Sequence, residues 1–271
     1  MERIEKALAK AREQRRAHTG TPRPAALLAS ATMPPPLNTG GSTATRVVTA
    51  SPATMRENRV IAGFAQDPRA DLFRMLRAQV LHGMEAVGGT TLGICSPNPG
   101  DGKTTIAANL AVSLAMDSNH TVLLVDLDLR QPKLSECFGL TPQIGMSDYL
   151  FDGAPLSDCL VNPGIDRLVL LPAGRPLSNS SEALASPQMV NLARELKARY
   201  PDRIVIYDLP PLLASDDALV FLPLIDATLL IVCEGLTSAG DVRRTVELLD
   251  QRKLLGTVLN RSSEAILRTY T

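Results

Sequence analysis

Aromatic side chains and net charge are scarce in this sequence. Aromatic residues make up 3% of the 271 positions and none is tryptophan, yet 45% of the chain is hydrophobic. The chain can therefore bury a sizeable core, and that core must be mainly aliphatic. The formal net charge is +0, which argues against nucleic acid as the main partner.

Cysteine and long apolar runs are also scarce. The four cysteines show no paired metal-ligand spacing, and Cys95 and Cys233 lie in apolar runs. We therefore expect these two cysteines to be reduced and to lie in the core of a cytosolic protein. The most apolar stretch, residues 218–233, is interrupted by Pro223 and Asp226, and it falls short of the ~20 apolar residues that a spanning helix needs. The sequence thus predicts a soluble, cytoplasmic chain without a spanning segment.

A glycine-rich turn at residues 96–105 has the residue order of a phosphate-binding loop. It follows an apolar stretch that predicts a strand and precedes a helical pattern at residues 106–115. In this layout, backbone N–H groups and the positive end of the helix surround phosphates, Lys103 reaches the outer ones, and Thr104 offers its hydroxyl to Mg²⁺. Pro97 stands where the strict pattern has glycine, but the flanking strand and helix favour the phosphate loop over an ordinary turn. The predicted nucleotide contacts are Asn98, Pro99, Gly100, Asp101, Gly102, Lys103, Thr104 and Thr105.

Carboxylates follow two of the predicted strands. Asp126 and Asp128 come at the end of an apolar run, and Asp208 ends the run that starts at Arg203. In doubly wound sheets, ligands bind beyond the carboxyl ends of the strands, so these acids are expected to face the phosphate loop. Taken alone, each acid could simply belong to a polar turn after a strand. The phosphate loop predicted nearby favours a ligand-binding site instead.

Strand and helix patterns alternate along most of the chain. They predict an α/β fold with a doubly wound, mainly parallel sheet of the P-loop NTPase type. Residues 59–261 are the expected domain. Residues 1–17 are expected to form a short helix that docks on a partner or frays, and the proline-rich residues 18–58 a disordered linker. Residues 262–271 are the expected flexible tail, which contains Tyr270.

Several stretches together resemble the bacterial tyrosine kinases, the P-loop autokinases of capsule and exopolysaccharide loci. They are residues 99–104, 126–132 and 206–211, and the resemblance covers about residues 59–261. It implies ATP and Mg²⁺ as cofactors. The roles it implies are catalysis by Lys103, Asp126 and Asp128, metal binding by Thr104, Asp126, Asp128 and Asp208, and a place near adenine for Asn260 and Arg261.

The resemblance also assigns a role to Asp71, Arg74 and Arg77. Their spacing alone predicts a solvated helix face, but the family uses Glu-x-x-Arg-x-x-Arg here to lock protomers into a ring. A homo-oligomeric ring is therefore expected, although Asp71 is one methylene shorter than glutamate. The family usually ends in a tyrosine cluster, whereas Tyr270 is the tail tyrosine here and is expected to be the phosphoacceptor.

Family membership further implies a partner and a location. The cytoplasmic tail of a transmembrane polysaccharide co-polymerase is the expected activator, and it would recruit this chain to the inner face of the plasma membrane. The predicted function is tyrosine autophosphorylation that regulates polysaccharide polymerisation and export. An ATP-binding assembly factor without kinase activity is the alternative. A partition-type ATPase is disfavoured because Asn98 stands where that branch has lysine.

Overall fold

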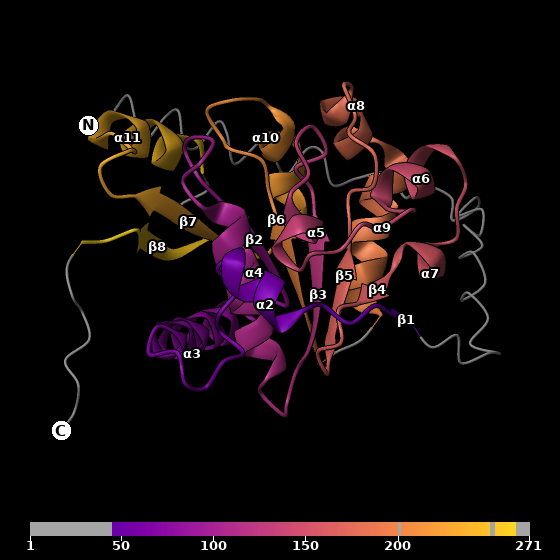
Figure 1. The fold of residues 1–271 in the computed structure, drawn as a ribbon. Coiled ribbons are helices and arrows are strands. Elements are labelled where there is room, and N and C mark those ends of the chain that lie inside the picture. The colour runs from indigo at the N-terminus through magenta and orange to yellow at the C-terminus, as the bar shows by residue number, and fades with distance from the viewer. Residues whose placement is uncertain (1–44, 200–201, 250–252, 264–271) are drawn as a thin grey trace, which may run out of the picture. The chain divides into compact units, whose positions relative to one another are not determined.

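The computed structural model describes residues 45–199, 202–249 and 253–263, which form an α/β unit around one sheet (Figure 1). The sheet order is β1-β4-β5-β3-β6-β2-β7-β8, and its pairs are parallel except for β4 with β5. The expected doubly wound, mainly parallel sheet is confirmed. The strands are β1 (Arg46–Val47), β2 (Thr91–Cys95), β3 (Thr121–Asp126), β4 (Val161–Asn162), β5 (Leu168–Leu171), β6 (Arg203–Asp208), β7 (Ala227–Cys233) and β8 (Leu254–Asn260).

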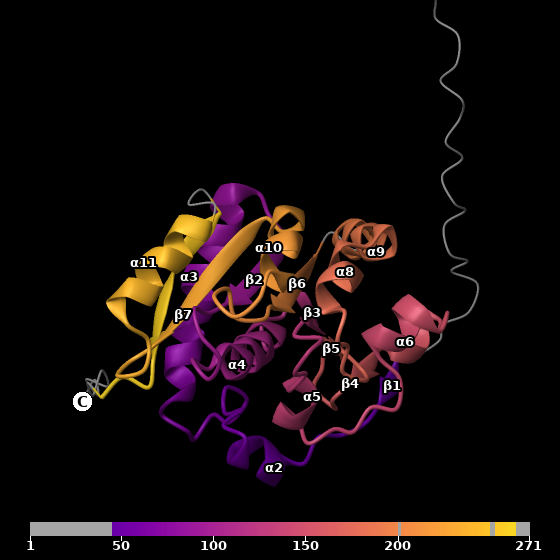
Figure 2. The ribbon, with the colours of Figure 1, turned by 90° about the horizontal axis from the view of Figure 1, so that it is seen from above.

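Helices cover both faces of this sheet, as the view from above shows (Figure 2). They are α2 (Pro52–Glu57), α3 (Ala70–Val87), α4 (Lys103–Ala115), α5 (Leu134–Cys137), α6 (Met146–Phe151), α7 (Leu156–Cys159), α8 (Ser180–Ala185), α9 (Pro187–Ala198), α10 (Asp217–Phe221), the 3-10 helix η1 (Leu222–Leu224) and α11 (Ala239–Leu248). In the described part of the chain, no helix combines the length and the apolar composition that crossing a bilayer requires.

Two apolar cores lie on opposite faces of the sheet because strand side chains alternate in direction. Along β3, Val122 and Leu124 belong to the core beneath α3 and α4, whereas Leu123 and Val125 belong to the core beneath α8, α9 and α10. Burial on both faces explains why the central strands read as continuous apolar runs. The rigid sheet in turn fixes the loops that follow β2, β3 and β6.

The expected linker at residues 18–58 extends too far towards the C-terminus. Residues 46–47 form β1, residues 52–57 form α2, and the Ala50 and Met55 side chains are buried in the core beneath α4. Pro52 opens α2, at a helix position where proline's missing N–H costs nothing. Proline content was therefore misleading for this segment. The predicted 1–17 helix, residues 18–44 and the tail from residue 264 onward, with Tyr270, lie outside the described residues.

Candidate nucleotide and phosphoryl-transfer site

The loop between β2 and α4 depends on glycine conformations. Gly100 and Gly102 have φ angles of 85° and 98°, in the region that favours glycine. A Cβ atom on Gly102 would lie 2.1 Å from Nδ2 of Asn260, so no larger residue fits without displacing that amide. The loop therefore has a backbone shape that brings its N–H groups close to a bound ligand, as phosphate-binding loops require.

Asp101 holds this loop in shape from inside. Its buried carboxylate accepts a hydrogen bond from the backbone N–H of Asn98 at 2.8 Å and another from the Thr237 hydroxyl at 2.7 Å. Nδ2 of Asn260 donates to the Asp101 carbonyl oxygen at 2.8 Å. The Asn98 side chain donates to Asp241 of α11 at 3.3 Å. These contacts give Asp101, Asn98 and Asn260 a supporting position in the structure, outside the lining of the cavity that the loop borders.

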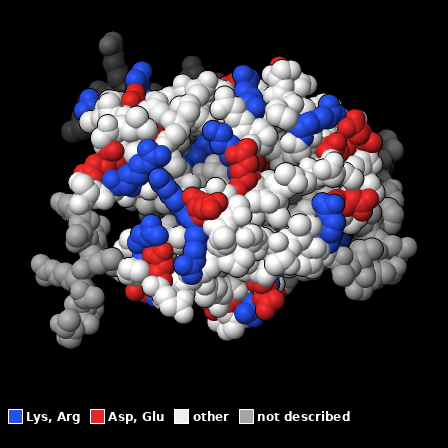
Figure 3. Space-filling model, viewed as in Figure 1, with Lys and Arg blue, Asp and Glu red and all other residues white. Residues whose placement is uncertain are grey.

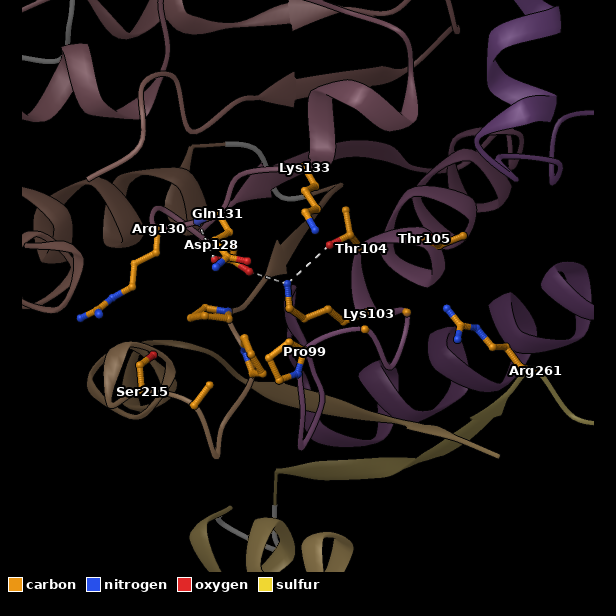
Figure 4. A pocket seen from close by; sticks show the side chains of 15 residues that line it. Pro99, Lys103, Thr104, Thr105, Asp128, Arg130, Gln131, Lys133, Ser215 and Arg261 are labelled. Atoms are coloured by element: carbon orange, nitrogen blue, oxygen red, sulfur yellow. Dashed lines mark hydrogen bonds and ion pairs between the residues drawn. The ribbon is translucent and has the colours of Figure 1, made fainter. Parts of the chain in front are cut away.

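That cavity has a volume of about 410 Å³ and lies where the loops after β2, β3 and β6 meet (Figure 4). On the face of the molecule seen in Figure 3, basic and acidic side chains interleave around a hollow. The residues that line the cavity are Pro99, Gly100, Gly102, Lys103, Thr104, Thr105, Asp128, Arg130, Gln131, Lys133, Pro210, Pro211, Ala214, Ser215 and Arg261.

The predicted acids converge behind Lys103. Asp126 and Asp208 are register partners at the ends of the neighbouring strands β3 and β6. Nζ of Lys103 lies 2.8 Å from Oδ2 of Asp128 and 3.9 Å from Oδ1 of Asp208. Asp128 and Asp208 are 80 positions apart in the sequence, and parallel pairing of β3 with β6 brings both to Lys103, as the sequence predicts.

Burial strongly affects the protonation of these groups. It raises the pKa of Asp126 to about 8, and the neighbouring Asp208 adds to the shift. Burial also raises the pKa of Asp208, against the effect of Lys103. Burial alone would lower the pKa of Lys103, but the charges of Asp208 and Asp128 outweigh it and raise this pKa. Lys103 therefore remains a cation at neutral pH.

The two acids after β3 differ in their surroundings. Both oxygens of Asp126 accept backbone hydrogen bonds, from the N–H groups of Asp128 and Leu134, each at 3.1 Å. Asp126 is 1% exposed, whereas Asp128 lines the cavity. Asp128 is therefore the acid of the two that borders the cavity, and Asp126 lies behind it.

The donor set fits Mg²⁺ when phosphates are present. The described residues contain no group of three or more histidine, cysteine, aspartate or glutamate side chains placed to hold a metal by themselves. Both carboxylate oxygens of Asp208 are buried without a hydrogen bond of normal geometry among the described residues. Burial raises the pKa of Asp208, and the nearby Lys103 ammonium and Thr104 hydroxyl oppose that rise. Mg²⁺ is usually held by one or two carboxylates together with waters and substrate phosphates. The carboxylates of Asp128 and Asp208, which lie beside the phosphate loop and share Lys103, meet that requirement.

Sequence reasoning missed part of the cavity wall. Arg130, Gln131, Lys133 and Ser215 line it but were not predicted as site residues. The signal was nevertheless available, because the first three lie two, three and five positions after Asp128, and Ser215 lies seven positions after Asp208. Arg261 does line the cavity, in a left-handed conformation with a φ of 56°.

The helix-face prediction for α3 is partly wrong. Arg74 pairs with Asp71 one turn earlier, and the side chains are 41% and 56% exposed, respectively. Arg77 instead reaches back to α4, where its Nη1 donates to the Ser113 carbonyl oxygen at 2.6 Å. The long side chain bends towards the neighbouring helix, which the three-residue spacing cannot reveal. Asp71 and Arg74 are thus the members of this set that point to solvent.

The fold and the loop together define a P-loop nucleotide-binding domain. In agreement, residues 90–251 match the family model described as AAA domain. The Bacillus subtilis (strain 168) tyrosine-protein kinase YwqD is 35% identical over 169 residues, which are 62% of this chain and 70% of YwqD. The chimerical protein CapA2B2, a solved structure, has a TM-score of 0.70 and 29% identity over 81% of this chain and 94% of that chain.

A longer relative matches as well. The Rhizobium meliloti (strain 1021) succinoglycan biosynthesis transport protein ExoP is 33% identical over 224 residues, which are 80% of this chain but 28% of ExoP. This chain therefore spans little more than a quarter of ExoP. Taken with the match to YwqD, these similarities show that the chain belongs to the family of bacterial tyrosine-protein kinases.

Proposed function

We propose that this chain is an ATP-dependent protein-tyrosine autokinase that regulates exopolysaccharide or capsule polymerisation and export. The observation that carries the proposal is the convergence of the glycine loop, Lys103 and the acids after β3 and β6 on one cavity. Family membership supports tyrosine as the acceptor. The name of ExoP, a succinoglycan biosynthesis transport protein, supports the link to polysaccharide export.

The loop and its flanking side chains would hold Mg-ATP. Backbone N–H groups of Gly100, Gly102 and their neighbours bind phosphate oxygens, and Lys103 exchanges its pairing with Asp128 for the outer phosphates. The Thr104 hydroxyl and the carboxylates of Asp128 and Asp208 would hold Mg²⁺, with Asp126 behind them. The ion supplies charge neutralisation for phosphoryl transfer. Asn260 supports the loop, and Arg261 lies at the end of the cavity proposed for adenine.

We propose that Asp126 accepts the hydroxyl proton of the acceptor tyrosine. A tyrosine hydroxyl has a pKa of ~10, so prior ionisation at pH 7 would cost roughly 4 kcal/mol. Burial raises the pKa of Asp126 to about 8, and a cation bound beside it would favour its ionised form. In that form Asp126 would orient the hydroxyl and receive its proton late, in a loose transition state. Access to Asp126 requires the ion pair between Lys103 and Asp128 to open, which phosphate binding to Lys103 would favour. We propose Tyr270 as the acceptor.

Assembly and location complete the proposal. Asp71 and Arg74 expose their side chains on α3 and would contact a neighbouring protomer in a ring, with Arg77 anchoring that helix to α4. The proposed activator is the cytoplasmic tail of a transmembrane polysaccharide co-polymerase, which would bring the chain to the inner face of the plasma membrane.

Phosphosite mapping after incubation with Mg-ATP tests the proposal. The wild-type chain is expected to carry phosphate on Tyr270, and Lys103→Met and Tyr270→Phe variants are expected to lose it. Lys253→Met is the matched control, because Lys253 is bonded to backbone carbonyls between residues 222 and 225, away from the nucleotide cavity. Absence of tyrosine phosphate under all conditions, including co-expression with a co-polymerase tail, would refute kinase activity.

A second candidate is an ATP-binding assembly factor without kinase activity. The observation that favours it is that Tyr270 stands alone in the tail, where the family usually has a cluster. This candidate predicts nucleotide-dependent oligomers and unchanged polysaccharide output in the Tyr270→Phe variant. The kinase proposal predicts that this variant changes the output.

A further inference from the structure

Arg130 lies at the end of the cavity opposite to Arg261. In Figure 4, Thr105 and Arg261 lie on one side of Lys103, whereas Arg130 and Ser215 lie on the other. If adenine occupies the side of Arg261, the outermost phosphate points towards Arg130. An acceptor in line with that phosphate must then approach from the Arg130 side.

A buried polar pair holds the inner edge of the Arg130 guanidinium. Nε donates to the Ser180 hydroxyl oxygen at 2.8 Å and to Oδ2 of Asp217 at 3.2 Å. The Ser180 hydroxyl in turn donates to the same Asp217 oxygen at 2.6 Å. Ser180 and Asp217 are both 0% exposed. A surface ion pair between mobile side chains contributes little, but here the carboxylate is fixed inside the protein and determines where the guanidinium points.

The outer edge of the same guanidinium is free to bind a ligand. Arg130 is 49% exposed, and none of the described residues accepts a hydrogen bond from its Nη groups. The second oxygen of Asp217 is buried and also has no partner among the described residues. The planar fork of arginine matches the oxygens of a phosphate group, which it binds through paired N–H groups.

The segment after β6 adds an apolar surface to the cavity wall. Pro210, Pro211 and Ala214 line the cavity, and they closely precede Ser215, which lies on the Arg130 side of Lys103 in Figure 4. Rigid proline rings and a methyl group offer an aromatic side chain a surface to pack on, with no buried polar group left unpaired. A tyrosyl ring against this wall would place its oxygen between the wall and the loop.

We propose that Pro210, Pro211 and Ala214 form the subsite for the acceptor tyrosine, and that Arg130 binds the phosphoryl group once it is on that tyrosine. The inference rests on the proposed kinase function and adds the acceptor site to it. In the step, the tyrosine oxygen forms a bond to the γ-phosphorus while the bond to the β–γ bridging oxygen breaks. That electron pair leaves with ADP, and the phenolic proton passes to the ionised carboxylate of Asp126. Arg130 then neutralises the phosphate that tyrosine has gained.

Binding of a phosphorylated peptide tests this subsite. The probe is a synthetic peptide of residues 262–271 with phosphotyrosine at position 270, measured by fluorescence anisotropy on the full chain with Mg-ADP present. Arg130→Gln is expected to weaken binding about 10-fold or more, because one charge-assisted hydrogen-bonding group is lost. The affinity for the unphosphorylated peptide is expected to change by less than about 3-fold.

Matched variants separate a local effect from misfolding. Arg175→Gln removes another half-exposed arginine, which pairs with Asp152 and does not line the cavity, and it is expected to bind the phosphopeptide like the wild type. Arg130→Lys keeps the charge but not the fork, so it should recover only part of the affinity. Ser180→Ala leaves both charges in place and should weaken phosphopeptide binding without changing Mg-ATP affinity, which keeps the test open if Arg130→Gln does not fold.

Each outcome decides one question. Unchanged phosphopeptide affinity in folded Arg130→Gln, with phosphate transfer by the wild-type chain intact, overturns the acceptor subsite and leaves the kinase function standing. An equal loss of affinity for both peptides also overturns the role of Arg130 in phosphate binding. A wild-type chain that binds Mg-ATP but transfers no phosphate to tyrosine overturns the proposed function, and the subsite with it.

Discussion

Replacing Gly102 by alanine is the most informative change in the phosphate loop. Its φ of 98° lies where a Cβ is unfavourable, and the added methyl would lie 2.1 Å from Nδ2 of Asn260. The amide of Asn260 would have to move, and its hydrogen bond to the Asp101 carbonyl oxygen, 2.8 Å long, would break. The substitution therefore strains the loop and removes one of its supports without touching any charge.

The magnitude follows from these two effects. A left-handed conformation costs a residue with a Cβ ~1–2 kcal/mol, and a typical lost hydrogen bond costs about 1 kcal/mol. Together they amount to roughly 2–3 kcal/mol. If the substitution destabilises the phosphate-binding conformation of the loop by this free energy, the Kd for Mg-ATP rises about 30- to 150-fold.

Isothermal titration calorimetry with Mg-ATP measures this change, and thermal unfolding of the same samples shows whether the fold is intact. Gly100→Ala is the matched control, because its φ of 85° carries the same backbone cost while the nearest atom to its added Cβ is 3.9 Å away. It should raise the Kd by less than Gly102→Ala. Asn260→Ala in the Gly102→Ala background should recover part of the affinity. A Kd for folded Gly102→Ala within about 3-fold of the wild type would refute the reasoning.

Further predictions concern the supports of the site and of the sheet. Thr237→Val leaves a buried oxygen of Asp101 without its donor, so we expect a loss of about 1–3 kcal/mol in the free energy of unfolding by urea titration, and unchanged stability would contradict this. Burial alone would raise the pKa of Asp226, but hydrogen bonds from Lys197, Thr90 and Thr91 together outweigh it and lower this pKa. The contribution of the ionised Asp226 to the free energy of unfolding is therefore present at neutral pH and lost as the pH falls below ~3.9 towards the folded pKa. The difference in unfolding free energy between wild type and Asp226→Asn should shrink in acid, and a constant difference would contradict this prediction. Ser186→Ala removes the side-chain cap of α9 and should cost ~1 kcal/mol in the same titration, with no change in Mg-ATP affinity.

Much of the fold could be predicted because the central strands are buried on both faces. Such strands read as uninterrupted apolar runs, and the acids at their ends mark the edge where parallel strands place a ligand. Asp126 and Asp208 do lie side by side. The segment 45–58 was misread because its composition suits a linker, whereas Ala50 and Met55 are ordered by contacts with residues far along the chain.

The rest of the site depends on side-chain direction, which sequence patterns do not carry. Asp101 lies within the glycine loop, yet its carboxylate turns inward to Thr237, which lies 136 positions along the chain. The direction of Arg130 depends on a serine and an aspartate from α8 and α10, so no local pattern could assign it. Arg77 likewise turns to α4 because a backbone carbonyl is available there.

The central claim is that the glycine loop, Lys103 and the acids after β3 and β6 form one nucleotide site. Calorimetric titration of the full chain with ATP in the presence of Mg²⁺ tests it most directly. We expect saturable binding at one site per chain, abolished by Lys103→Met and greatly weakened without Mg²⁺. No heat of binding from folded wild-type protein, or equal affinity in the Lys103→Met variant, would contradict the account.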